Sequence, residues 1–341
     1  MPGIAPGFAA TAPVRRLVCI APNASVDKIV AVDALRPGEI HRPVVLSIVA
    51  GGKALNAGRA AAACGRPGVA VPVLAGHAGA WMADGLAAEG IEARPVWIAG
   101  ETRECLSVLD RSTGRLTEFY EAGPAMDAAA WAQVEAAIAA AVAEDPEGTL
   151  VLVSGSLPEG APPDAHARAA RVVREAGGRA VIDAGGVALA GAMAERPWLA
   201  KVNALEASQA TGLPLGGEAE ALSAARALRR AGALMALVSR GADGAVLVDA
   251  EGAGWRIGPP PELGAFPVGS GDSLIGGLAA ALAQGHSVPE AARRGAAAAA
   301  ANALSPGQGR LDPADVARLL SGIALESLAC RESRATLPPE R

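Results

Sequence analysis

The sequence predicts an α/β fold in which a mostly parallel sheet is covered by helices on both faces. Continuously apolar segments, such as 149–154 (TLVLVS) and 234–239 (LMALVS), are typical of strands that are buried on both sides. Amphipathic segments with the period of helices, such as 164–176 and 218–231, stand between these strands. This alternation indicates a parallel sheet with helical connections. Because the chain has no internal repeat and no low-complexity linker, we expect residues 15–325 to form a single domain.

The expected elements follow one another with recognisable boundaries. The first strand, 16–21, ends before Pro22 and Asn23, which are typical turn residues. Glycines after the apolar period close several of the helices. The apolar runs predict further strands at 28–32, 42–48, 69–75, 93–98, 104–109, 116–120, 149–154, 179–183, 198–202 and 234–239, and 244–249 as an antiparallel continuation. The helical periods predict helices at 54–64, 80–89, 126–143, 164–176, 218–231, 272–284, 288–303 and 313–320.

The early short strands lie outside the main strand–helix alternation. Strands 104–109 and 116–120 are predicted to form a hairpin around Ser112–Gly114. We therefore expect a small β lid on the edge of the sheet, built from about 26–48 and 93–122. The tails, 1–14 and 326–341, are expected to be flexible.

Composition excludes several classes of function. The chain has 341 residues, of which 51% are hydrophobic, so it can bury a large core and is not disordered throughout. The net charge of −5 argues against general binding to nucleic acid or to an anionic membrane. No uncharged stretch has the roughly 20 strongly apolar residues of a membrane span. The four cysteines lie far apart, which favours reduced thiols in a cytoplasmic protein.

Polar and glycine residues follow many of the expected parallel strands. In an open parallel sheet, ligands bind beyond the carboxyl ends of the strands. These positions therefore predict one cleft. The segments that follow the strands are 23–27, 155–158, 183–186, 203–206 and 239–241.

The most informative segment is 266–277, which runs from Pro267 and Val268 through Gly269-Ser270-Gly271-Asp272 into an apolar helix. Glycines let backbone N–H groups turn toward one point, and the start of a helix favours an anion. A carboxylate at that place can deprotonate a hydroxyl that attacks a bound phosphoryl group. The alternative is that Asp272 only caps the helix.

A second glycine pair, Gly51-Gly52, precedes Lys53 and Asn56 at the start of another predicted helix. The pair permits a ligand to approach the backbone, and the lysine and asparagine offer hydrogen-bond donors; a flexible loop with a capping asparagine is the alternative. Lys53 is one of only three lysines, the others being Lys28 and Lys201. The chain has neither a P-loop motif nor a strand–GxGxxG–helix fingerprint, which argues against those nucleotide-binding classes.

Taken in order, these motifs resemble those of the ribokinase-like carbohydrate kinases of the phosphofructokinase B group. Within this group the chain is most similar to the phosphosugar branch, which includes 1-phosphofructokinase, tagatose-6-phosphate kinase and minor 6-phosphofructokinase. The resemblance extends over about 16–320. The motifs that carry it are 23–27 (NASVD), 35–39 (LRPGE), 51–56 (GGKALN), 100–103 (GETR), 117–118 with 123–124, 155–158 (GSLP), 201–206, 239–241 (SRG) and 268–273 (VGSGDS).

The resemblance implies a three-layer α/β/α ribokinase-like domain with a β lid, often shared across a homodimer, and ATP-dependent phosphoryl transfer with Mg²⁺. It also implies a role for each matching residue. Asp272 would be the general base, with Gly269, Ser270 and Gly271 as the anion hole. Asp27, Gly52 and Asn56 would bind sugar hydroxyls, and Lys53 and Arg103 the phosphate of the sugar. Lys201, Asn203, Ser239, Gly241 and Asn302 would bind ATP, and Glu206 would hold Mg²⁺ through water.

The expected reaction is phosphorylation of a ketohexose monophosphate, best represented by the conversion of fructose 1-phosphate to fructose 1,6-bisphosphate. Tagatose 6-phosphate and fructose 6-phosphate remain open as substrates, as does an unphosphorylated sugar or nucleoside. A binding protein without turnover is a further alternative, against which the intact Gly269–Asp272 segment argues. Two cations, Lys53 and Arg103, favour a phosphorylated substrate. Alternatively, Arg103 pairs on the surface with Glu101 or Glu118.

Overall fold

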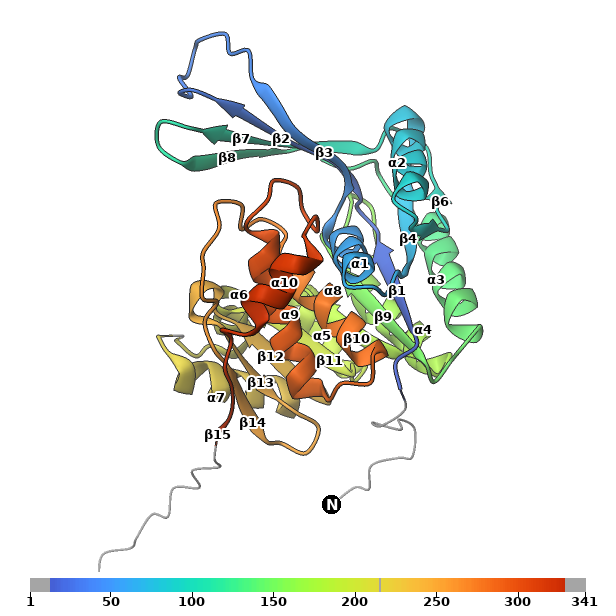
Figure 1. The fold of residues 1–341 in the computed structure, drawn as a ribbon. Coiled ribbons are helices and arrows are strands. Elements are labelled where there is room, and N and C mark those ends of the chain that lie inside the picture. Colours follow the sequence, from blue (N-terminus) through green and yellow to red (C-terminus); the bar gives the residue numbers. More distant parts are fainter. Residues whose placement is uncertain (1–12, 215, 329–341) are drawn as a thin grey trace, which may run out of the picture.

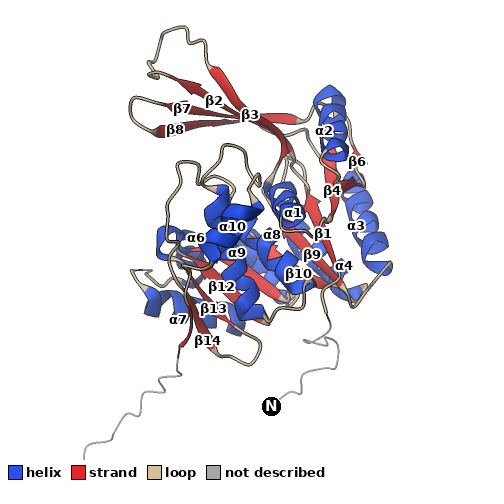
Figure 2. Cartoon of the chain, viewed as in Figure 1, coloured by secondary structure: helices blue, strands red, loops and turns tan. Residues whose placement is uncertain are grey.

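The protein was analysed as a computed structural model that describes residues 13–214 and 216–328. A twisted, mostly parallel sheet forms the centre and lies between two layers of helices, as Figure 1 and Figure 2 show. The parallel strands are β1 (Arg16–Ala21), β4 (Val69–Leu74), β9 (Thr149–Ser154), β10 (Arg179–Asp183), β11 (Leu199–Asn203) and β12 (Met235–Ser239). One edge continues antiparallel through β13 (Ala245–Val248), β14 (Gly254–Ile257) and β15 (Leu325–Leu328). The strand order is β15-β14-β13-β12-β11-β10-β9-β1-β4-β5, in which β5 is the short strand Glu92–Ala93.

Alternate residues of the strands face two separate cores. Leu150 and Leu152 pack into one core, whereas Val151 and Val153 pack into the other. Because side chains of a strand alternate between faces, a fully apolar strand supplies both cores at once. The first core is covered by α1 (Lys53–Ala63), α2 (Gly76–Ala88), α8 (Ser270–Ala283) and α9 (Val288–Asn302), with α10 (Pro313–Leu320) beside α9. The second is covered by α3 (Ala128–Ala143), α4 (Ala165–Glu175), α5 (Gly186–Ala194), α6 (Ala204–Thr211) and α7 (Glu218–Ala231).

The lid is a separate sheet with the order β3-β2-β7-β8, which projects from the body in Figure 1. Its strands are β2 (Ser25–Val32), β3 (Val44–Gly51), β7 (Arg103–Asp110) and β8 (Arg115–Tyr120). The register places Asp27 opposite Val49 and Cys105, and Cys105 opposite Tyr120. This row belongs to one face of the lid, because residues at matched positions of paired strands share a face.

The structure confirms the predicted fold class and corrects the boundaries of the lid. The expected strand 93–98 is two short strands, β5 (Glu92–Ala93) and β6 (Val96–Trp97), which pair with β4 of the main sheet and not with the lid. Apolar character alone does not say which sheet edge a short strand joins. Residues 326–328, expected in a flexible tail, pair with β14 as part of β15. Residues 1–12 and 329–341 of the expected tails lie outside the described residues.

The sequence interpretation missed α5, α6 and β14. The segment of α5 contains mostly Ala and Gly with no polar face, so it lacks the period of an amphipathic helix. Helix α6 has only eight residues, and β14 only four. Among the residues that the structure describes, no helix combines the length and the hydropathy of a membrane span.

Candidate active site

One cavity of about 1070 Å³ lies between the lid and the carboxyl ends of the parallel strands. It is large enough for two small substrates at once. Every site residue predicted from the sequence lines it except Asn302. The predicted residues that the fold brings together there are Asp27, Gly52, Lys53, Asn56, Arg103, Lys201, Asn203, Glu206, Ser239, Gly241, Gly269, Ser270, Gly271 and Asp272.

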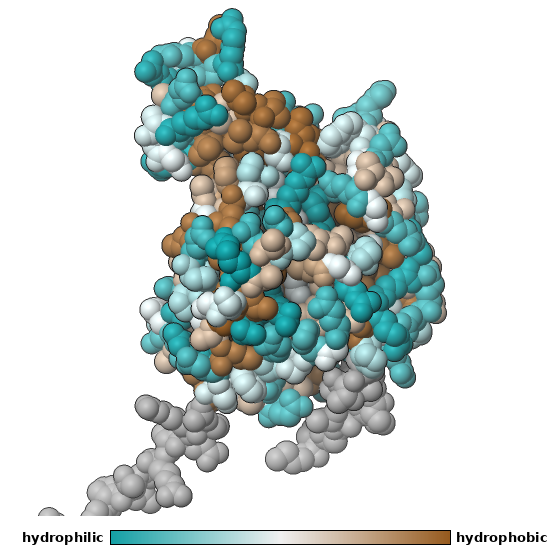
Figure 3. All heavy atoms as spheres, viewed as in Figure 1, coloured by the Kyte–Doolittle hydropathy of each residue, from teal (hydrophilic) through white to brown (hydrophobic). Residues whose placement is uncertain are grey.

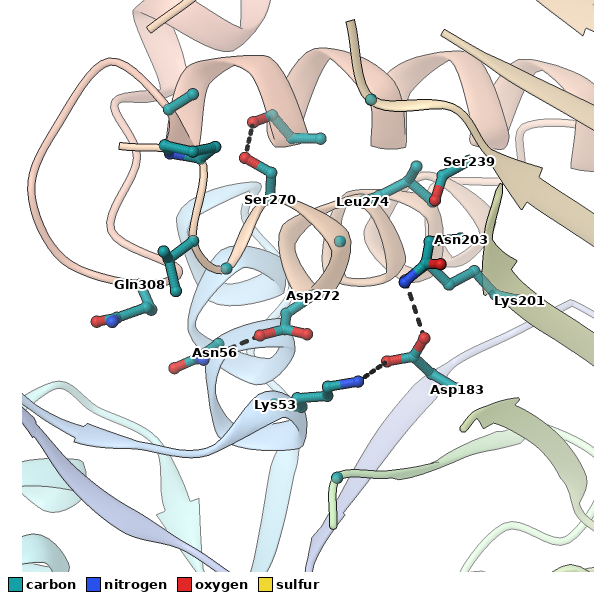
Figure 4. A pocket seen from close by; sticks show the side chains of 18 of the residues that line it. Lys53, Asn56, Asp183, Lys201, Asn203, Ser239, Ser270, Asp272, Leu274 and Gln308 are labelled. Carbon is teal, nitrogen blue, oxygen red and sulfur yellow. Dashed lines mark hydrogen bonds and ion pairs between the residues drawn. The ribbon is translucent and has the colours of Figure 1, made fainter. Parts of the chain in front are cut away.

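Asp272 lies in the first turn of α8, in the middle of the cavity wall, as Figure 4 shows. Its side chain is 7% exposed, and its Oδ2 accepts a hydrogen bond of 2.9 Å from Nδ2 of Asn56 on α1. Burial and the nearby charge of Asp183 raise the pKa of Asp272 to about 7. Asn56, Lys201 and Lys53 oppose this rise, because they favour the charged carboxylate. Asp272 is therefore a carboxylate whose pKa suits proton transfer near neutral pH.

The turn before Asp272 can hold an anion. Gly269 has a φ of 83°, and a Cβ at this position would lie 2.9 Å from Cβ of Gln308. A Cβ at Gly271 would lie 2.9 Å from Nζ of Lys201. The first N–H groups of a helix have no partner within the helix and attract negative charge. Glycine is thus required at Gly269 both by its backbone conformation and by close packing, and a cation lies directly beside the start of the helix.

Asp183, at the end of β10, is a site residue that the sequence analysis did not single out. Its side chain is 1% exposed and lies between two lysines. Oδ1 lies 2.9 Å from Nζ of Lys201, and Oδ2 lies 3.7 Å from Nζ of Lys53 (Figure 4). Burial opposes the charged form, but both lysines and the hydroxyl of Ser154 hold the pKa of Asp183 below its usual value. The sequence feature that could have identified Asp183 is its position at the end of a strand, in the same segment as Gly185 and Gly186.

Asn203 and Glu206 form the start of α6. The side chain of Asn203 accepts from the backbone N–H of Glu206 at 2.9 Å, and the Glu206 carboxylate accepts from the N–H of Asn203 at 2.8 Å. This reciprocal pair is a capping box. It holds both side chains at the mouth of the cavity, beside the end of β11.

Asp27 and Arg103 lie at the lid end of the cavity. Asp27 accepts a hydrogen bond of 2.6 Å from the hydroxyl of Ser25, and burial raises its pKa. The guanidinium of Arg103 donates to the backbone oxygens of Asn23, at 3.0 Å, and Glu121, at 3.4 Å.

The alternative surface pairing of Arg103 is absent from the described part of the chain. Glu101 accepts from the backbone N–H of Ala78 at 2.5 Å, and Glu118 accepts from the hydroxyl of Tyr120 at 2.7 Å. Arg103 is thus held in the cavity wall by backbone carbonyls and by no carboxylate among the described residues.

The expectation that Asn302 lines the nucleotide pocket requires correction. Asn302 is 1% exposed and does not reach the cavity. Its Nδ2 donates to the backbone oxygen of Val268 at 2.9 Å, and its Oδ1 accepts from Gly309 N and from the hydroxyl of Ser273. It therefore holds the turn before Asp272 against the loop after α9. Ser239 and Gly241 do line the cavity, at the end of β12 and in the turn that follows.

Comparison with known proteins agrees with this geometry. Residues 15–315 match the model of the pfkB family carbohydrate kinases. The chain is 33% identical over 266 residues to a protein of Xanthomonas campestris named 1-phosphofructokinase, an alignment that covers 76% of this chain and 82% of the relative. A relative with the same name from Rhodobacter capsulatus is 33% identical over 279 residues, covering 82% of this chain and 87% of the relative.

Among solved structures, phosphofructokinase-2 from Escherichia coli in complex with substrates and products superposes with a TM-score of 0.83 and 28% identity. The superposition covers 91% of this chain and 99% of the other. A carboxylate of raised pKa stands beside a helix start and two lysines, in a cavity with room for two small substrates. On this site and on these similarities, the chain belongs to the pfkB family of ATP-dependent carbohydrate kinases.

Proposed function

We propose that this kinase transfers the γ-phosphoryl group of ATP to a ketohexose monophosphate, with fructose 1-phosphate as its best substrate and fructose 1,6-bisphosphate as product. The observation that carries the choice of a phosphorylated sugar is the pair of cations in the cavity, Lys53 and Arg103. Arg103 has no carboxylate partner among the described residues, so its charge is available to a ligand phosphate. The name of the 33% identical relatives supports fructose 1-phosphate.

Fructose 6-phosphate is the second candidate. A relative from Mycobacterium tuberculosis, 29% identical over 304 residues, is named ATP-dependent 6-phosphofructokinase isozyme 2. Tagatose 6-phosphate would place its phosphate on the same cations and stays among the substrates to be compared. A free sugar or nucleoside is disfavoured, because it would leave Arg103, which has no carboxylate partner among the described residues, without an anion in the cavity.

The roles follow from positions in the cavity. Asp272 accepts the proton of the sugar hydroxyl, whose oxygen bonds to the γ-phosphorus as the bond to the ADP oxygen breaks. Gly269, Ser270 and Gly271 offer backbone N–H groups to the charge that develops on the transferred group. Asp27, Gly52 and Asn56 position the sugar. Lys201, Ser239 and Gly241 face the nucleotide; they line the cavity from β11, from β12 and from the turn after β12.

Mg²⁺ is expected with ATP, and Glu206 with Asn203 suits it. In phosphoryl-transfer sites Mg²⁺ is typically held by one or two carboxylates, by phosphates and by waters. Oε2 of Glu206 caps α6, whereas Oε1 has no protein donor among the described residues. This oxygen would hold a water of the ion at the cavity mouth. The ion would neutralise phosphate charge during transfer.

We also propose that two copies of the chain associate through their lids. Ile48 and Phe119 occupy matched positions with Lys28 and Leu106, on the face opposite to the row of Asp27. Ile48 is 38% and Phe119 55% exposed, and Figure 3 shows hydrophobic residues gathered on the lid. Exposed apolar sheet faces are typical of protein interfaces. A tetrameric form of phosphofructokinase-2 from Escherichia coli is among the similar solved structures and supports self-association.

The test is a coupled assay of ATP consumption with fructose, fructose 1-phosphate, fructose 6-phosphate and tagatose 6-phosphate. We expect kcat/KM for the best phosphosugar to exceed that for fructose by about 10²–10⁴-fold, the effect of two charge-assisted anchors. Arg103→Ala should raise KM for the phosphosugar and leave KM for ATP nearly unchanged. A wild type that prefers free fructose, or an unchanged KM in Arg103→Ala, would contradict the assignment.

A further inference from the structure

Arg59 is a buried arginine on α1 that does not line the cavity. Its side chain is 6% exposed, and burial lowers its pKa despite the nearby Glu89. Nε donates to Oε2 of Glu89 at 2.7 Å. Nη2 donates to the backbone oxygen of Ala50 at 2.7 Å, and Nη1 to that of Gln308 at 3.1 Å. Burying a charged group is costly, so this set of contacts calls for a reason beyond packing.

The first reason is the orientation of Asn56. Nη1 of Arg59 lies 3.5 Å from Oδ1 of Asn56, and Nδ2 of the same amide donates to Asp272. A guanidinium only donates hydrogen bonds, so it attracts the oxygen end of the amide and leaves the NH₂ end toward Asp272. A flipped amide would place its oxygen against the carboxylate and its NH₂ against the cation. Arg59 therefore favours the one orientation in which Asn56 stabilises the charged base.

The second reason is the two backbone oxygens. Gln308 packs directly behind the anion-binding turn, since its Cβ leaves no room for a side chain at Gly269. Ala50 precedes Gly51 at the end of lid strand β3, where a Cβ would lie 2.1 Å from Cγ of Asp27. The side chain of Arg59 thus contacts three parts of the site: Ala50 in the lid strand beside Asp27, Gln308 behind the anion hole, and Asn56, which binds Asp272.

We propose that Arg59 is a positioning residue of this kinase, which holds Asn56 against Asp272 and couples the root of the lid to the phosphoryl-transfer site. The inference rests on the proposed role of Asp272 as the base. The same guanidinium binds the backbone oxygen of Ala50 at the root of the lid and faces the amide oxygen of Asn56. The placement of the lid strand and the orientation of Asn56 therefore depend on one side chain.

The test is the pH profile of kcat in the wild type, Arg59→Met and Arg59→Lys. Asn56, Asp183, Lys201 and Lys53 are the groups that act on Asp272. Of these four, Asn56 is the one that Arg59 contacts, so the variants act on Asp272 through Asn56. Both variants should lose kcat by about 10–100-fold. The acidic limb of the profile should move up by about one pH unit, because the carboxylate loses an oriented donor. KM for ATP should stay nearly constant.

Arg229→Met is the matched control. Arg229 also donates hydrogen bonds to two backbone oxygens, those of Leu234 and Ala250, but it lies outside the active-site cavity. The Arg229→Met variant should lower the stability of the protein without moving the acidic limb of the pH profile. If Arg59→Met does not fold, the pH profile of Arg59→Lys is the test, because lysine keeps the positive charge beside Glu89.

A double-mutant cycle separates positioning from general loss of structure. In an Asn56→Ala background, Arg59→Met should move the acidic limb no further, since the group through which it acts is gone. An unmoved limb in both Arg59 variants, or equal shifts with and without Asn56, would overturn the proposal. The Asp272→Asn variant separates the proposed function from the inference about Arg59. Retained turnover in Asp272→Asn would refute the role of Asp272 as the base. Lost turnover in Asp272→Asn together with wild-type behaviour of the Arg59 variants would refute only the positioning role of Arg59.

Discussion

Replacing Asp272 with asparagine should stabilise the protein while it abolishes turnover. Burial and the charge of Asp183 move the pKa of Asp272 from 3.8 to about 7. Each pH unit of this difference corresponds to about 1.4 kcal/mol, so the folded protein loses up to about 4 kcal/mol by keeping this carboxylate charged. An amide of nearly the same shape removes the charge and can still accept from Asn56. At pH 8.5 we expect the free energy of unfolding to rise by about 2–4 kcal/mol.

The effect must depend on pH in a defined direction. Between 3.8 and about 7 the folded state binds one proton more than the unfolded state at Asp272, so wild-type stability falls as pH rises through this window. At pH 5 the folded wild type keeps the proton, and the advantage of the variant should shrink to about 1.5 kcal/mol. For a domain of this size 1 kcal/mol corresponds to about 2 °C in Tm. We therefore expect a Tm increase of about 4–8 °C at pH 8.5 and about 3 °C at pH 5.

The measurement is thermal unfolding of both proteins at the two pH values, together with kcat. Asp249→Asn is the matched control: Asp249 is 8% exposed, but it accepts from two donors, the backbone N–H of Ala253 and the indole of Trp255. The Asp249→Asn variant should be less stable than the wild type at both pH values. An amide has a single acceptor oxygen, so its NH₂ group would face one of the two donors. Turnover of Asp272→Asn should fall by about 10²–10⁴-fold. A Tm difference that is absent, or equal at both pH values, would refute the electrostatic reasoning.

Three further predictions concern the anion hole, the buried ion pair and the lid. Gly269→Ala should lower kcat by about 10²–10³-fold, because a side chain at a φ of 83° and 2.9 Å from Gln308 displaces the turn; wild-type kcat in this variant would argue against an anion hole here. Lys201→Met should destabilise the fold by about 3–5 kcal/mol in denaturant unfolding at pH 8, since Asp183 remains buried without the nearer of its two cations. The loss should be smaller at acidic pH, where Asp183 takes up a proton, and a loss that does not vary with pH would contradict this. Phe119→Asp should shift the assembly toward monomer in analytical ultracentrifugation, whereas a fully active wild-type monomer at micromolar concentration would exclude association through the lid.

Much of the site was readable from the sequence because it is local. Gly269–Asp272 and Gly51–Lys53 each combine glycines with the start of a helix, and both features follow from a few consecutive residues. The strand–helix alternation placed these segments at one edge of a parallel sheet. Once the alternation is known, the carboxyl ends of the strands must share that edge.

Contacts between distant residues were not readable in this way. Asn56 and Asp272 are 216 positions apart, and Arg59 reaches Gln308 across 249. Apolar periodicity says which face of a helix is buried, but it does not say which polar group of another helix lies opposite. The resemblance alone assigned Asn302 to nucleotide binding, and it could not show that the amide of this residue is bound to the backbone of Val268 and Gly309.

The sequence by itself determined the fold class and the order of most elements, and it predicted the chemistry proposed for the helix start at Asp272. These depend on local periods and on glycine conformations, which neighbouring residues largely fix. Only the tertiary structure decided that Asp183 lies between Lys53 and Lys201, and that the strands at 92–97 join the main sheet and not the lid. The pKa of Asp272 was decided there too, because burial and the charges of other elements set it, and both exist only when the chain is packed.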